Sequence, residues 1–314
     1  MSLTENTIIP TISIIVPCYN EENVIEIFLQ HIEPILNNLH KSYEIIFIND
    51  GSTDDTFNVM LNAKKQYKHI RILNFSRNFG KEAALTAGLE HARGDAVIPI
   101  DVDLQHPPEL IPIFIQKWEE GYEVVAGKRV NRTGEHGLKK ISAKLFYKIH
   151  NSISDITIPN DIGDYRLISR KVVDTISKLP ENQRFMKGIF AWVGYKTAVV
   201  EYKQEYRIAG QSNFSGWKLW NLALDGITSF STVPLRIWLY LGLIISFFAF
   251  LYGSIIIIKT LIFGIDLPGY ASLLTTILFL GGIQLMGIGI LGEYIGRMYQ
   301  ETKRRPTYII ENEY

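Results

Sequence analysis

The sequence predicts an α/β protein with a doubly wound, mostly parallel sheet, followed by two transmembrane helices near the C-terminus. In the first part of the chain, short β-rich apolar runs alternate with helix-like stretches, as in a parallel sheet with crossover helices. Two long segments without any charge then follow, residues 237–258 and 267–292. A bilayer core needs roughly 20 apolar residues per helix, so each segment is long enough to cross it.

The elements of the α/β part alternate in chain order. The expected strands are residues 12–16, 44–48, 70–75, 96–100 and 123–126. The expected helices are residues 21–39, 54–67, 80–92 and 108–120. Ligands of such sheets bind beyond the carboxyl ends of the strands. The polar residues that follow each strand are therefore the candidates for a functional site.

The uncharged segments predict a transmembrane hairpin with spans at about 235–258 and 271–293. The connecting loop carries only Lys259, whereas basic residues flank the outer ends of both spans: Arg236, Arg297, Lys303, Arg304 and Arg305. By the positive-inside rule, the α/β part and both termini are expected on the cytoplasmic side of the inner membrane. Clustered glycines in the second span permit close helix approach, which leaves association into a homo-oligomer open.

The remaining segments follow from this division. Residues 1–213 are expected to form a cytoplasmic α/β domain, and residues 297–314 a cytoplasmic tail. Residues 138–149 read as a basic amphipathic helix, which suits an anionic membrane surface. In residues 214–231, tryptophans recur on one helical stripe beside the first span, which favours the membrane interface. An ordinary surface helix and a core-facing helix are the respective alternatives.

Composition excludes several classes of protein. Lysine plus arginine equals aspartate plus glutamate, 32 each, so bulk charge gives no reason to expect nucleic-acid binding. The single cysteine, Cys18, excludes an internal disulfide and a cysteine-based zinc site. No phosphate-cradling glycine motif follows the first strand, which removes the main support for kinase or nicotinamide chemistry.

Three polar clusters follow the first, second and fourth expected strands. They include Glu21, Asp50 and the pair Asp101 and Asp103. Clustered carboxylates repel one another, and a bound cation would relieve that repulsion. If residues 101–103 are extended, Asp101 and Asp103 point to the same side and can share one ion. Oxygen ligands of this kind suit Mg²⁺ or Mn²⁺, which also binds substrate phosphates.

An ordered set of motifs gives these clusters a family context. The chain contains P-x-Y-N-E at 17–21, N-D-G-S-x-D at 49–54, S-R-N-F-G-K-E at 76–82, D-x-D-L-Q at 101–105, G-D-Y-R-L at 163–167 and R-F-M-K-G at 184–188. With the hairpin, it resembles the family-2, A-type glycosyltransferases that act on polyprenyl phosphate, such as bactoprenol glucosyltransferases and dolichol-phosphate mannose synthases. The resemblance implies transfer of a hexose from a nucleotide-sugar donor to a polyprenyl phosphate lipid, with glucose from UDP-glucose expected.

The resemblance also implies roles at matching positions. The expected donor-binding residues are Pro17, Tyr19, Glu21, Asp50, Asp101, Gln105, Arg129 and Arg207. The expected metal ligands are Asp101, Asp103 and Gln105. The expected acceptor-binding residues are Lys140, Ser142 and Lys144. Catalytic roles are expected for Asp103, for Asp164, where some relatives carry a base, and for Arg166, which would position the acceptor phosphate.

Other readings differ in the product or in the class of protein. The same reaction could use mannose, an N-acetylhexosamine or an aminoarabinose derivative. A processive polysaccharide synthase shares the donor site, but it normally has more membrane helices and a Q-x-x-R-W signature that this chain lacks. A transporter or scaffold would need neither aspartate. Transfer or donor hydrolysis separates these classes.

Overall fold

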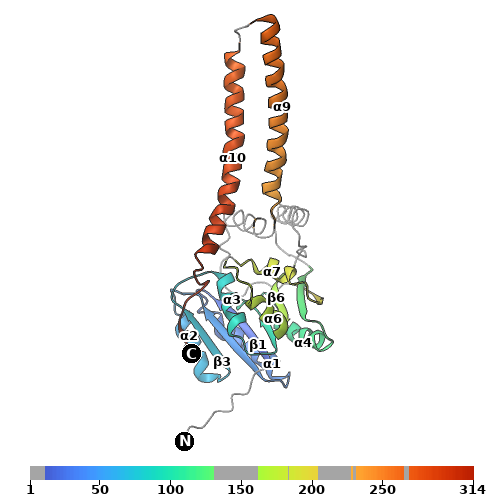
Figure 1. Ribbon diagram of the computed structural model, residues 1–314. Helices are drawn as coiled ribbons and strands as arrows, with labels where there is room; N and C mark the ends of the chain where they lie inside the picture. The colour runs from blue at the N-terminus through green and yellow to red at the C-terminus, as the bar shows by residue number, and fades with distance from the viewer. Residues whose placement is uncertain (1–10, 131–161, 183, 204–227, 229–230, 265–268) are drawn as a thin grey trace.

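The computed structural model describes residues 11–130, 162–182, 184–203, 228, 231–264 and 269–314. Figure 1 shows an α/β body from which two long helices project together on one side. The chain then returns to the body, where its C-terminus lies beside the sheet. This arrangement confirms the predicted fold class, a mostly parallel α/β sheet followed by a helical hairpin.

The sheet has eight strands in the order β7-β5-β6-β4-β1-β2-β3-β8. Their bounds are β1 Ile12–Cys18, β2 Tyr43–Asn49, β3 Ile70–Phe75, β4 Ala96–Pro99, β5 Val124–Arg129, β6 Ile162–Ser169, β7 Thr197–Tyr202 and β8 Ile310–Glu313. Strands β4, β1, β2 and β3 are parallel, whereas β6 and β8 run antiparallel to their neighbours. The strand order reverses between β1 and β4, which is where ligands bind in open α/β sheets.

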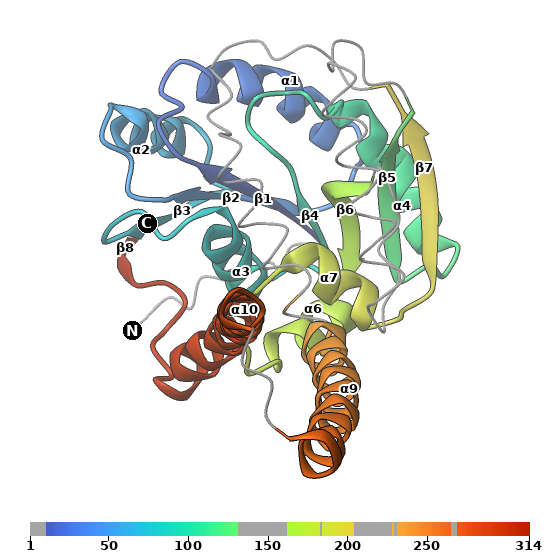
Figure 2. The same ribbon diagram turned by 90° about the horizontal axis from the view of Figure 1, so that it is seen from above.

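Helices cover both faces of this sheet. Their bounds are α1 Ile25–Asn37, α2 Thr56–Gln66, α3 Lys81–His91, the 3₁₀ helix η1 Pro108–Leu110, α4 Ile111–Glu119, α6 Arg170–Ser177 and α7 Met186–Trp192. Helices α1, α2 and α4 lie on one face, and α3, α6 and α7 lie on the other (Figure 2). Because side chains alternate along a strand, Ile14 packs into the first layer and Ile15 into the second.

The hairpin consists of α9, Val233–Phe263, and α10, Tyr270–Thr302. Both are longer than the predicted spans. Their most apolar windows have mean hydropathies of 2.5 and 1.3, and neither window is buried within the protein. Long apolar helices exposed along their length fit a bilayer. The chain therefore carries a C-terminal membrane anchor.

The C-terminal residues do not form a detached tail. Strand β8 pairs antiparallel with β3 at the edge of the sheet. Tyr308 stacks on Phe75 with 5.2 Å between ring centroids, and Arg71 forms an ion pair with Glu313 at 2.5 Å. The chain thus leaves α10 and pairs with the edge of the sheet.

Candidate active site

The loops after β1 and β2 interlock at the carboxyl edge of the sheet. Asn20 adopts a left-handed conformation, with φ of 57°, and its side-chain oxygen accepts a hydrogen bond from the Thr53 amide at 2.8 Å. The Glu21 amide donates to the Thr56 hydroxyl at 2.8 Å. Tyr19 remains 47% exposed at this edge, beyond the β1 residue Pro17. The predicted donor residues Pro17, Tyr19 and Glu21 therefore lie on one rigid rim.

Asp50 organises the next loop. Its carboxylate is buried and accepts hydrogen bonds from the backbone amides of Phe79 at 2.7 Å and Gly80 at 2.9 Å. Burial raises the pKa of Asp50, although these two hydrogen bonds oppose the shift. Gly51 has φ of 63°, and a Cβ there would lie 2.3 Å from the backbone carbon of Arg77. Residues 77–80 are consequently held against the loop after β2.

The expectation that residues 101–103 are extended is wrong. Strand β4 ends at Pro99 and a turn follows, in which Leu104 has φ of 57°. The buried Asp103 carboxylate accepts the backbone amide of Gln105 at 3.2 Å. The turn arises because the chain must pass from β4 into η1 within eight residues.

Lys81 joins two of the predicted site acids. Its ammonium lies 2.7 Å from an Asp101 carboxylate oxygen and 3.3 Å from an Asp164 oxygen. Burial opposes ionisation of all three groups, but their mutual attraction prevails. It holds the pKa of Lys81 above its ordinary value and the pKa values of both aspartates below theirs. At neutral pH the cluster therefore carries two carboxylates and one ammonium.

His106 supports Asp101 from the other side. Its Nε2 lies 3.5 Å from Asp101 Oδ2, and its Nδ1 lies 2.7 Å from the Tyr202 hydroxyl. The imidazole also stacks on Tyr165, with ring centroids 5.1 Å apart. Strands β6 and β7 thereby fix the orientation of His106, and through it the carboxylate of Asp101.

The two predicted arginines of the described region have different surroundings. Arg129 ends β5 and reaches towards Gly163, since a Cβ on Gly163 would lie 3.2 Å from a terminal nitrogen of Arg129. Arg166 is buried, donates to the Gly163 carbonyl at 2.6 Å and lies 4.0 Å over the ring of Phe190. Burial lowers the pKa of Arg166 to about 10, so it stays charged at neutral pH.

Arg166 also lines a pocket of about 300 Å³ together with Lys187 and Phe190. This pocket lies on the α7 side of β5 and β6, and Arg166 is part of its wall. Its guanidinium interacts electrostatically with Asp164 and Glu82. A role in holding these acids fits this geometry more directly than the predicted contact with an acceptor phosphate.

The structure therefore brings together Asp101, Asp103, Gln105, Asp164 and Arg129 around the ends of β4, β5 and β6. Four predicted residues, Arg207, Lys140, Ser142 and Lys144, lie outside the described residues. Sequence reasoning missed Lys81 and Tyr202 as members of the cluster. The signal for Lys81 was its place in the S-R-N-F-G-K-E motif, directly after Gly80 at the start of α3.

The carboxylates at this edge suit a divalent cation in their chemistry. Magnesium commonly takes one or two protein carboxylates and completes its shell with water and substrate phosphates. Oδ1 of Asp164 is buried and accepts no hydrogen bond from the described residues, which leaves an oxygen able to receive a ligand. Within that same part of the chain, no three acidic, histidine or cysteine side chains already surround a metal position. A metal bound here would be held by these carboxylates together with oxygens of a bound diphosphate.

Comparison with known proteins identifies the family of the chain. Glycosyl transferase family 2 matches residues 13–177, and the GtrB C-terminal hairpin matches residues 233–298. The bactoprenol glucosyl transferase of Shigella phage SfV is 55% identical over 302 residues, which cover 96% of this chain and 98% of that protein. An uncharacterized glycosyltransferase of Synechocystis sp. is 50% identical over 96% of this chain and 95% of its own length.

Solved structures share the fold. Glucosyl-3-phosphoglycerate synthase from Mycobacterium tuberculosis, in complex with Mn²⁺, uridine diphosphate and phosphoglyceric acid, superposes with a TM-score of 0.51. It is 22% identical, and the match covers 70% of this chain and 76% of that one. The sheet, the hairpin and the near full-length similarity lead to one conclusion: the chain belongs to glycosyl transferase family 2 and carries the GtrB-type membrane hairpin.

Proposed function

We propose that this glycosyltransferase moves glucose from UDP-glucose to undecaprenyl phosphate or a similar polyprenyl phosphate. The observation that carries the proposal is the similarity to bactoprenol glucosyl transferases, 55% identity over nearly the whole of both chains. The acidic cluster at the β1–β4 switch point supports it, because a nucleotide diphosphate bound there would meet Asp101 and Asp103. The membrane hairpin supports it as well, since the acceptor is a lipid.

The reaction forms one bond and breaks another. A phosphate oxygen of the acceptor attacks the anomeric carbon of glucose, and the bond from that carbon to the donor diphosphate breaks. The electron pair leaves with UDP, and attack from the opposite face inverts the anomeric centre. The attacking oxygen is already anionic at neutral pH, so Asp164 need not act as a strong base.

The protein groups divide this work. Asp101 and Asp103, with Gln105 beside them, would hold Mg²⁺ or Mn²⁺, which would neutralise charge on the leaving diphosphate. Lys81 lies between Asp101 and Asp164 and limits the repulsion between these acids. Arg129, at the end of β5, supplies a further cation for a phosphate group. Tyr19 offers an exposed ring at the rim for the nucleoside.

The acceptor side rests on sequence. We propose that Lys140, Ser142 and Lys144 receive the lipid phosphate and that Arg207 faces a phosphate group of the donor. We also propose that the catalytic domain and both termini are cytoplasmic, because the basic residues at 297–305 flank one end of the hairpin. Association through the transmembrane helices stays a prediction.

A transfer assay tests the function. The full-length protein in detergent is given undecaprenyl phosphate and, separately, radiolabelled UDP-glucose, UDP-N-acetylglucosamine, GDP-mannose and a UDP-linked aminoarabinose derivative. We expect a single labelled sugar per lipid, formed from UDP-glucose. Preference for another donor would reassign the sugar, and lipid-linked chains of several sugars would indicate a processive enzyme. Absence of transfer from every donor would contradict the proposal.

A further inference from the structure

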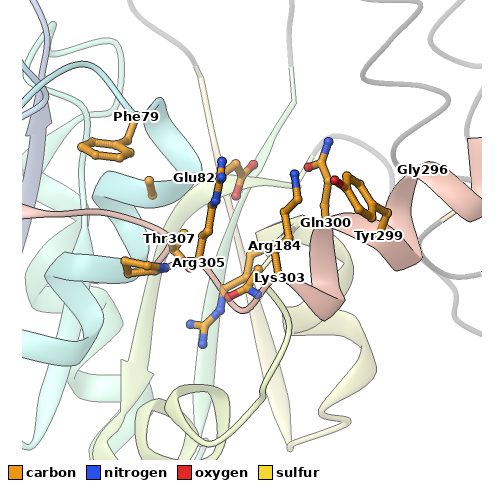
Figure 3. A pocket seen from close by; sticks show the side chains of 12 residues that line it. Phe79, Glu82, Arg184, Gly296, Tyr299, Gln300, Lys303, Arg305 and Thr307 are labelled. Carbon is orange, nitrogen blue, oxygen red and sulfur yellow. The ribbon is translucent and has the colours of Figure 1, made fainter.

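A second polar pocket lies where the membrane helix α10 meets the catalytic domain. It has a volume of about 630 Å³ and is lined by residues at the start of α3, by Asn182 and Arg184, and by residues from the segment 296–307 (Figure 3). Three cations line it: Arg184, Lys303 and Arg305. The reaction proposed above assigns no role to any of them.

The walls of this pocket are tied together. The Asn182 amide donates to both carboxylate oxygens of Glu301 on α10, at 3.2 and 3.0 Å. The Met186 amide donates to a carboxylate oxygen of Glu82 on α3 at 3.0 Å. Asn182 thus bonds to α10 and Met186 to α3, so both helices are tied to the same stretch of chain. A pocket with linked walls keeps its shape before a ligand arrives, which lowers the entropic cost of binding.

The cations are arranged for an anion. The Arg184 side chain is only 6% exposed, and it donates to the carbonyls of Glu181 and Leu179 at 3.1 and 3.0 Å. In Figure 3, the side chains of Lys303 and Arg305 extend from the end of α10 in the same direction, towards Glu82. One of the 12 lining residues is acidic, Glu82, and burial raises its pKa to about 7. Glu90 forms an ion pair with Arg184 at 3.5 Å, so the excess of positive charge in the pocket comes from Lys303 and Arg305.

The position of the pocket along α10 suggests the source of its ligand. The uncharged stretch of α10 ends at Gly292, and the first lining residue on this helix is Gly296. Four helical residues span about 6 Å. The headgroup layer on each side of a bilayer is roughly 5–8 Å thick. The membrane-side edge of the pocket thus lies at the depth of lipid headgroups. Lys303 lies seven residues farther along the chain, about 10 Å deeper on the aqueous side, which is still within about one Debye length of the charged surface.

We propose that this pocket binds the phosphate headgroup of an anionic bilayer phospholipid. The lipid is distinct from the polyprenyl phosphate acceptor, and it fills the junction between α10 and α3. Lys303 and Arg305, which follow the end of α10 on the side away from the membrane, contact the headgroup, and Arg184 forms the buried part of the wall. Because Glu82 directly follows Lys81, the occupied pocket also abuts the helix that presents Lys81 to the acidic cluster.

Lipid binding to the full-length protein in neutral detergent tests this site. Short-chain phosphatidylglycerol is titrated by calorimetry into the wild type, the double variant Lys303→Gln/Arg305→Gln and the control Arg304→Gln. Arg304 is a neighbouring cation that does not line the pocket. We expect saturable binding to the wild type, weakened by roughly tenfold or more in the double variant and less than about twofold in the control.

Further arms separate the sources of phosphate. Phosphatidylcholine of the same chain length and inorganic phosphate are expected to bind at least roughly tenfold more weakly than phosphatidylglycerol, because they lack net charge or an anchor. Equal binding by the double variant, or equal loss in the control, would overturn the proposal. Preference for undecaprenyl phosphate, with a raised acceptor KM in the double variant, would overturn it too, since the pocket would then belong to the acceptor. Circular dichroism confirms that each variant is folded.

Discussion

Lys81 forms an ion pair with Asp101 across the edge of the sheet, with Nζ 2.7 Å from Oδ1, and Asp164 lies 3.3 Å from the same ammonium. Asp101 follows the end of β4, whereas Asp164 is the third residue of β6. Lys81, at the first turn of α3, is therefore the cation that allows both carboxylates to stay ionised in one cluster. Removal of the Lys81 ammonium is therefore expected to affect the cluster as much as removal of one of its acids.

Replacing Lys81 by Met should lower kcat by roughly a hundredfold, the effect of losing one preorganised charged group. Without the ammonium, Asp101 and Asp164 repel each other and the pKa of at least one rises. Transfer is measured at saturating donor and acceptor. The matched control is Lys117→Met, which removes an exposed ion pair with Glu120 and should leave kcat within about twofold. Equal loss in both variants would exclude a specific role for Lys81.

Asp103→Asn should abolish transfer and leave the fold intact. The Asp103 side chain accepts the Gln105 amide through Oδ1, and an asparagine oxygen can accept the same hydrogen bond. The lost property is the negative charge, which a metal ligand needs. Transfer is assayed with saturating Mn²⁺, and thermal unfolding is followed in parallel. Near-normal turnover with an unchanged Tm would remove Asp103 from the metal site.

The residues that sequence predicted and those it missed differ in one physical respect. Strands β1 to β5 and the helices between them carry a local hydrophobic pattern, so their positions were predicted within a few residues. Strand β8, with the sequence I-E-N-E, has no such pattern and exists because it pairs with β3. Lys81 likewise lies 20 residues from Asp101, and only the crossover through α3 brings them together. Tertiary pairing of this kind leaves no periodic signal in the chain.

Gly51→Ala should destabilise the protein and weaken donor binding. Gly51 has φ of 63°, and an added Cβ would lie 2.3 Å from the backbone carbon of Arg77 and 2.4 Å from the Asn78 nitrogen. Backbone cannot move aside as a side-chain end can, so the 77–80 loop must shift away from Asp50. The control is Gly121→Ala, with φ of 90° and no atom within 4 Å of the new Cβ.

Gly121→Ala isolates the conformational cost, about 1–2 kcal/mol. We expect Gly51→Ala to lower the free energy of unfolding by more than that, and to raise the donor KM, whereas the control leaves KM unchanged. Calorimetry and donor titration give both values. Equal unfolding energies for the two variants would show that the loop yields without cost.

Glu82 should make the stability depend on pH. Burial, reinforced by Asp164, raises its pKa from 4.5 to about 7. Between these values the folded protein binds more protons than the unfolded chain, so this contribution to stability is present below about pH 4.5 and is lost as pH rises through 7. The loss is at most about 3 kcal/mol. Glu82→Gln, whose side-chain oxygen can still accept the Met186 amide, should flatten the Tm profile between pH 5 and 7. A profile as steep as that of the wild type would contradict the assignment.

The attachment of β8 gives the last prediction, a contrast between the two acids that share Arg71. Arg71 lies 2.8 Å from Glu44 and 2.5 Å from Glu313. The Glu44 side chain is 7% exposed, whereas that of Glu313 is 41% exposed. Arg71→Met leaves the buried Glu44 carboxylate without its cationic partner and should lower the free energy of unfolding by roughly 3–5 kcal/mol. Glu313→Gln removes an ion pair that water partly screens and should cost less than about 1 kcal/mol.

Because Glu44 also accepts hydrogen bonds from Ser13 at 2.6 Å and from the Arg93 amide at 2.7 Å, its charge is fixed in place and cannot turn to solvent. Thermal unfolding of the full-length protein in detergent measures both costs. If Glu313→Gln proved as damaging as Arg71→Met, β8 rather than Glu44 would be the main partner of Arg71, and the returning C-terminus would be a principal support of the sheet.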